Sequence, residues 1–94
     1  MTFGDVSVYQ FSRALYRDLC DLAGPSLAPQ SARVILNACE GTIERVATDR
    51  NYFARPARSL FLEVRRFMPM TAQASAFKLI IGWLELAEEW IDAQ

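Results

Sequence analysis

Apolar residues recur three or four positions apart along almost the whole 94-residue chain, and prolines and glycines divide this pattern into four segments. That spacing places apolar side chains on one face of an α-helix. The chain shows no strand-like alternation and none of the Asn-Gly or Asp-Gly pairs that form tight hairpins. We therefore predict an all-α protein, with residues 1–94 forming a single helical domain. A small antiparallel four-helix bundle is the expected architecture, and an irregular orthogonal four-helix domain is the alternative.

The first two helices have recognisable ends. Ser7, with Gln10 three residues later, fits a capping box, so the first helix is expected to begin at Ser7. Gly24-Pro25 is expected to end it. The second helix should begin within residues 26–29, where proline is tolerated in a first turn, and should end within residues 49–52.

The third and fourth helices are separated by a proline. The third is expected to begin at Pro56, an allowed first helical position, and to stop at Pro69. Thr71 is a suitable cap for the fourth helix, which should run to about Ile91. Gly41, inside the second helix, costs about 1 kcal/mol relative to alanine. Close approach of a neighbouring helix would explain it.

The chain contains no histidine, and this restricts both metal binding and catalysis. Histidine is the commonest metal ligand and general base. The carboxylates Glu40 and Glu44, one turn apart, do not make the usual dimetal site of a bundle without it. Cys20 and Cys39 suit small core positions better than nucleophilic roles. With no glycine-rich phosphate loop either, we expect no catalytic residue, no metal site, no cofactor and no enzymatic activity.

Arginines gather in residues 45–66, where six of them face only Asp49 and Glu63, a segment charge of +4. Arginine interleaved with aromatic residues such as Tyr52 and Phe53 is typical of phosphate or nucleic-acid contact. The candidate anion-binding residues are Arg45, Arg50, Arg55 and Arg58. Because the whole chain has a net charge of only −1, a regulator that binds nucleic acid or an anionic ligand is the alternative function and is not favoured.

Internal ion pairs would explain the same arginines. Arg55 and Arg58 lie at the start of the third helix, where the helix dipole disfavours positive charge. The end of the fourth helix, where the dipole disfavours negative charge, carries Glu85, Glu88, Glu89 and Asp92. Antiparallel neighbours would bring these two ends together. Exposed pairs between them would each contribute about 0–1 kcal/mol and would help to select which helices pack together.

The fourth helix carries two apolar stripes. One contains Phe77, Ile80 and Leu84, and the other consists of Leu79, Trp83, Leu86 and Trp90. A helix with two apolar faces is either central or shared with another subunit, although tryptophans also dominate small cores. Because 52% of the residues are hydrophobic, more than one small core needs, we predict a protein–protein interaction module. It is expected to form a homodimer or other homo-oligomer, or to dock on a protein partner, through the second stripe.

The longest apolar run, residues 79–84, is bracketed by Lys78 and Glu85 and is far shorter than the ~20 residues that span a bilayer. The N-terminal residues do not resemble a signal peptide. We therefore expect no membrane partner and a cytoplasmic location. Nine arginines against one lysine indicate a GC-rich, bacterial genome.

Overall fold

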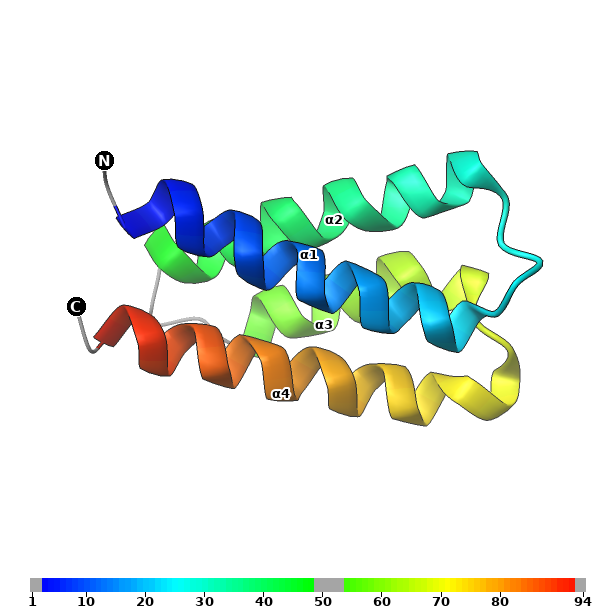
Figure 1. Cartoon of the computed structure of the whole chain (residues 1–94). Helices are drawn as coiled ribbons and strands as arrows, with labels where there is room; N and C mark the ends of the chain where they lie inside the picture. Colours follow the sequence, from blue (N-terminus) through cyan, green and yellow to red (C-terminus); the bar gives the residue numbers. More distant parts are fainter. Residues whose placement is uncertain (1–2, 49–53, 93–94) are drawn as a thin grey trace.

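The computed structural model describes residues 3–48 and 54–92, with side chains over 10–48 and 55–90, and this part of the chain is an all-α four-helix bundle without strands (Figure 1). The predicted fold class is confirmed. In chain order the elements are α1 (Phe3–Ala23), α2 (Pro29–Thr48), α3 (Ala54–Val64), the 3₁₀ helices η2 (Arg65–Phe67) and η3 (Met70–Ala72), and α4 (Gln73–Asp92).

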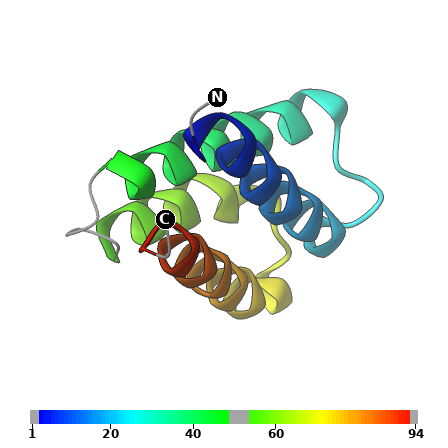
Figure 2. The ribbon, with the colours of Figure 1, turned by 60° about the vertical axis from the view of Figure 1, so that its left-hand side comes forward.

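Successive helices run in opposite directions, and the first and last helices close the bundle. Figure 1 shows the start of α1 and the end of α4 at the same end of the molecule. Figure 2 shows α1 beside α4 and α2 beside α3, as two layers that cross at an angle. The short connections between successive helices account for this up-and-down order.

The core takes side chains from all four helices. Each fully buried leucine, isoleucine or valine contributes about 1.5–3 kcal/mol relative to an exposed position. The largest fully buried apolar side chains are Leu15, Leu19, Ile35, Ile43, Val46, Leu60, Val64, Ile80 and Leu84. The buried hydroxyl of Thr42 donates to the carbonyl oxygen of Ala38 across 2.8 Å, so this polar group does not oppose burial.

The first helix begins at Phe3, four residues before the expected cap at Ser7. The capping-box prediction is therefore wrong, because the backbone of Ser7 is helical. The predicted end at Gly24 is confirmed.

The third helix ends at Val64 instead of continuing to Pro69. A residue before proline is disfavoured in the α conformation, and Met68 is extended, with φ −103° and ψ 140°. The chain tightens into η2 before that point. Thr71 lies inside η3 and so does not occupy the expected cap of α4. The Gln73 side-chain amide instead donates to the carbonyl oxygen of Arg65 across 3.4 Å, which links the two ends of this connection.

Gly24, directly after α1, and Gly41, inside α2, differ in backbone conformation. Gly24 has φ +92°, and its N–H donates to the carbonyl oxygen of Cys20 across 3.1 Å, so it terminates α1 in a conformation that side chains with a Cβ rarely adopt. A Cβ at Gly41 would meet nothing within 4 Å. The expected close approach of a neighbouring helix at Gly41 is therefore wrong.

This contrast makes a matched pair of substitutions. Gly24→Ala is expected to lower the free energy of unfolding by about 1–2 kcal/mol, because alanine is strained at positive φ. Gly41→Ala is expected to raise it by about 0.5–1 kcal/mol, because the site is open and alanine favours the helix. Urea unfolding followed by circular dichroism measures both. Equal effects of the two substitutions would contradict the backbone argument.

Candidate interaction surface on α4

One face of α4 lies in the core, and the apolar stripe beside it does not. Ala76, Ile80, Leu84 and Ala87 are at most 1% exposed. Leu86 is 50% exposed and Trp90 44% exposed, whereas Leu79 and Trp83 are half-buried. A single 20-residue helix with a 3.6-residue repeat has more apolar positions here than its neighbours cover.

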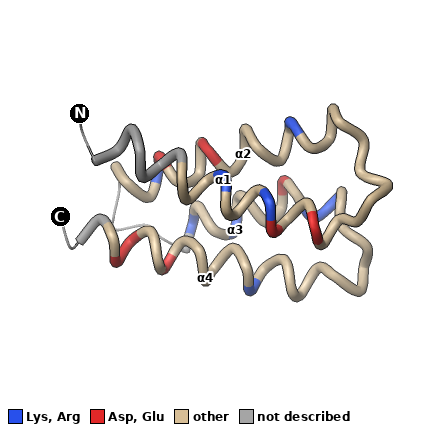
Figure 3. Tube along the Cα trace, viewed as in Figure 1, with Lys and Arg blue, Asp and Glu red and all other residues tan. Residues whose placement is uncertain are grey.

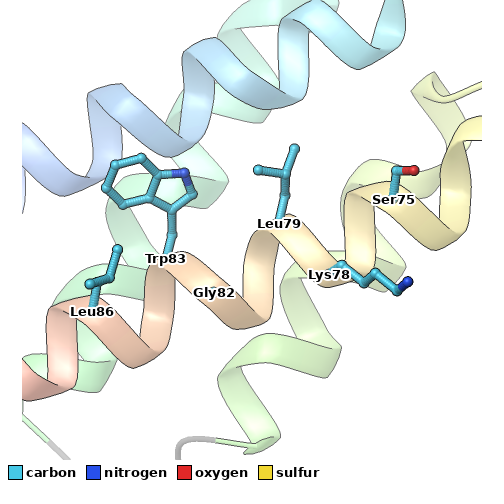
Figure 4. A pocket seen from close by; sticks show the side chains of 6 residues that line it. All are labelled: Ser75, Lys78, Leu79, Gly82, Trp83 and Leu86. Atoms are coloured by element: carbon cyan, nitrogen blue, oxygen red, sulfur yellow. The ribbon is translucent and has the colours of Figure 1, made fainter.

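A shallow groove of about 470 Å³ runs along this uncovered side of α4 (Figure 4). A Cβ at Gly82 would meet nothing within 4 Å, so the missing side chain opens the middle of the groove. We call Ser75, Leu79, Gly82 and Leu86 the α4 seam, because their spacing of four, three and four residues keeps them on one side of the helix. Lys78 and Trp83 complete the lining of the groove.

Trp83 attaches α4 to α1. Its indole Nε1–H donates a hydrogen bond to the carboxylate Oδ2 of Asp18 across 2.7 Å, and its ring meets Phe11 edge-on with 6.1 Å between the centroids. A hydrogen bond to a charged acceptor is stronger than one between neutral groups. Trp83 therefore holds two helices of the same chain together and offers only one side to the groove.

Trp90 lies seven residues, or about two helical turns, after Trp83 on the same side of α4. Its ring centroid is 6.5 Å from that of Phe11, at an interplanar angle of 59°. Phe11 of α1 therefore contacts both tryptophans of α4. Of the four residues predicted as partner-binding, Leu86 and Trp90 are the most exposed, Leu79 borders the groove, and Trp83 is chiefly an intramolecular contact.

A second apolar groove, of about 620 Å³, lies between α3 and α4, and the sequence analysis did not identify it. Phe61 and Phe77 meet edge-on across it with 5.1 Å between their centroids, and Leu62 is 47% exposed. Leu62 lies on the opposite side of α3 from the fully buried Leu60 and Val64. The adjacent pair Phe61-Leu62 was the available signal, because both cannot face one core from a helix.

The candidate anion-binding arginines of the described part of the chain share their end of the bundle with acidic residues (Figure 3). Arg45, Arg55 and Arg58 are exposed, and Arg50 lies outside the described residues. Figure 3 shows acidic positions of α2 and α4 at the same end of the bundle as the basic start of α3. Interspersed charges of both signs weaken the attraction for a polyanion.

The start of α3 and the end of α4 lie at the same end of the bundle, as expected (Figure 1). Over the described side chains, Arg58 has no nitrogen within 4.0 Å of a carboxylate oxygen of α4. Arg58 lines the groove between α3 and α4 instead. Exposed long side chains lose entropy on pairing, which offsets most of the Coulomb attraction.

The two cysteines are free thiols with different burial. Complete burial raises the pKa of Cys39 from its ordinary value of 9.0 to about 12, and the nearby charges of Glu40 and Glu63 act in the same direction. Burial also raises the pKa of Cys20. Because the thiolate is the reactive form, neither environment activates a nucleophile.

The described residues contain neither a helix that could cross a membrane nor a cluster of metal ligands. No helix in residues 3–48 and 54–92 combines the length and apolar character needed to cross a bilayer. Within the same ranges, no three His, Cys, Asp or Glu side chains gather in a way that could hold a metal ion.

Comparison of the chain with protein-family models, with curated proteins and with solved structures gives no match.

The link between Trp83 and Asp18 predicts a specific loss. Asp18→Ala is expected to lower the free energy of unfolding by about 1–2 kcal/mol, because it leaves the partly buried indole N–H without its acceptor. Asp18→Asn keeps an acceptor oxygen and should recover much of the loss. Asp21→Ala, at an exposed position of the same helix, is the control and should change stability by less than about 0.5 kcal/mol. Denaturant unfolding measures all three, and equal losses at positions 18 and 21 would contradict this role.

The raised pKa of Cys39 predicts instability in alkali. Between pH 9 and about 12 the unfolded chain loses the thiol proton and the folded chain keeps it, so the unfolded state binds fewer protons and stability falls as pH rises. The slope attributable to Cys39 is at most about 1.4 kcal/mol per pH unit. Unfolding of the wild type and of Cys39→Ala across this range should show a shallower decline for the variant. Parallel curves would contradict the prediction.

Proposed function

We propose that this chain is a protein–protein interaction module that self-associates through the outer side of α4. The observation that supports the proposal is the α4 seam, a strip of small and apolar residues along a groove, on a helix whose opposite face already lies in the core. A helix that is apolar on two faces is commonly shared between subunits. The seam has the spacing at which one helix packs against another.

Burial of this surface supplies a plausible driving force. Leu86 is half-exposed, so complete burial would contribute about half of the 1.5–3 kcal/mol typical of a leucine. In a symmetric dimer this contribution occurs twice. Trp90 adds a large, partly exposed aromatic surface beside it, and tryptophan is among the residues that most often dominate interface energetics.

The other exposed features support their own functions less well. The rings of Phe61 and Phe77 already contact each other across the groove between α3 and α4, which satisfies part of their apolar surface. The arginines share their end of the bundle with acidic residues of α2 and α4, which weakens the case for a nucleic-acid or anionic-ligand regulator. The free thiols Cys20 and Cys39 fit the reducing cytoplasm that we propose as the location.

Leu86 and Leu62 provide a matched test of the surface. They are 50% and 47% exposed, but Leu86 lies on the α4 seam and Leu62 lies on α3. Leu86→Gln is expected to weaken self-association about tenfold or more, because two leucines leave the interface of a symmetric dimer. Leu62→Gln is expected to leave it unchanged. Sedimentation equilibrium over a wide concentration range measures both.

Each outcome of this experiment bears on the proposal. A wild-type chain that stays monomeric at millimolar concentration would overturn self-association. Equal weakening by the two substitutions, or weakening by Leu62→Gln alone, would show that the surface is elsewhere. Circular dichroism of each variant confirms that the helices are intact, because glutamine is a good helix former at both positions.

A further inference from the structure

We infer that the occupant of the α4 seam is a second copy of this chain, with its α4 antiparallel to the first and a two-fold axis passing beside Gly82. The inference rests on the proposed function and adds the partner, the direction and the register. It is supported by the position of Gly82 at the centre of the groove on α4 and by the distribution of charge along α4.

The register follows from the seam. Gly82 is its central small residue, and nothing lies within 4 Å of the site of a Cβ, so two helices approach most closely where two Gly82 residues meet. With the two-fold axis at this point, residue i of one copy lies level with residue 164 − i of the other. Leu79 of one chain is then within one residue, about 1.5 Å along the axis, of Leu86 of its partner. The apolar walls of the two grooves therefore meet.

The direction follows from the charges beside the seam. Lys78 is the only lysine of the chain, and it is exposed on α4. At the helical step of about 100° per residue, Lys78, Glu85 and Glu89 lie on the same flank of α4, and Leu79 and Trp90 lie on the flank next to α1. In the antiparallel register Lys78 lies level with position 86 of the partner, between Glu85 and Glu89. The ammonium group of Lys78 is thus attracted to the two carboxylates of the partner, and the two-fold axis makes this attraction occur twice in the dimer.

A parallel pair would lack this complementarity. Its two-fold axis runs along the helices, so each residue lies level with its own copy and the charged flank of one helix faces the apolar flank of the other. Lys78 would then meet the side of the partner that carries Leu79, with no carboxylate at that level. Glu85 and Glu89 would likewise face the apolar flank of the partner, which offers them no positive charge.

Cross-linking of introduced cysteines distinguishes the two directions. Ser75 and Glu89 are both exposed, and their numbers sum to 164, so the antiparallel register brings Ser75 of one chain beside Glu89 of the other. Two Ser75 residues would then be about 21 Å apart along the axis, beyond the reach of a disulfide. The variants Ser75→Cys and Glu89→Cys are made in a Cys20→Ser background, which removes the partly exposed native thiol. Cys39 can stay, because it is fully buried. They are oxidised separately and as a mixture, with the Cys20→Ser chain alone as the control.

The expected result is a disulfide-linked dimer in the mixture and none in either variant alone. Cross-linking of each variant to itself would establish a parallel pair and overturn the inference while leaving self-association intact. A dimer by sedimentation that gives no cross-link in any sample would place the contact in another register or on another helix, and would also overturn it. A monomer by sedimentation would overturn the proposed function, and the inference with it.

Exchanging the charges of Lys78, Glu85 and Glu89 tests independently whether these residues attract each other across the antiparallel pair. Lys78→Glu is expected to weaken the dimer about three- to tenfold at low salt, since two exposed pairs become repulsive. Adding Glu85→Lys and Glu89→Lys to the same chain should restore at least half of the loss. The matched control is Arg33→Glu, at an exposed position of α2, which should leave the association constant unchanged. Failure of the triple variant to recover would contradict the antiparallel flank.

Discussion

The contact between Trp83 and Asp18 joins the first helix of this protein to the last and fixes which side of α4 faces α1. The indole hydrogen bond is 2.7 Å long and joins residues 65 positions apart. Phe11 packs against the same ring and against Trp90, so α1 contacts α4 over two of its turns. With Trp83 held toward α1, the helical repeat turns Gly82 and Leu86 away from the core.

The proposed interaction surface is therefore a consequence of how the bundle closes. Trp83 lies in the same stripe as Leu79 and Leu86, yet it contacts its own chain and leaves the adjacent positions exposed. Gly82 weakens the helix slightly relative to alanine, and in return α4 has a hollow at its centre. A helix with large side chains at every outward position would hold a second helix further away.

The sequence predicted the fold class, because helical periodicity depends on local spacing. In α2, for example, Ile35, Cys39 and Ile43 follow one another at four-residue spacing in the sequence, and all three are buried. The errors arose where two local signals competed or where a non-local contact decided the outcome. Ser7 matched a capping box but lies inside α1, and Arg58 had the charge for a pair with α4 but lines a groove instead.

By itself, the sequence determined that the chain forms four amphipathic helices and that α4 has more apolar surface than one small core requires. It did so because the 3.6-residue repeat, prolines and glycines act through neighbours along the chain. Only the tertiary structure decided which part of that surplus stays exposed. Trp83 and Leu86 have the same apolar character in the sequence, and the partner that separates them, Asp18, lies on another helix, where no local pattern marks it.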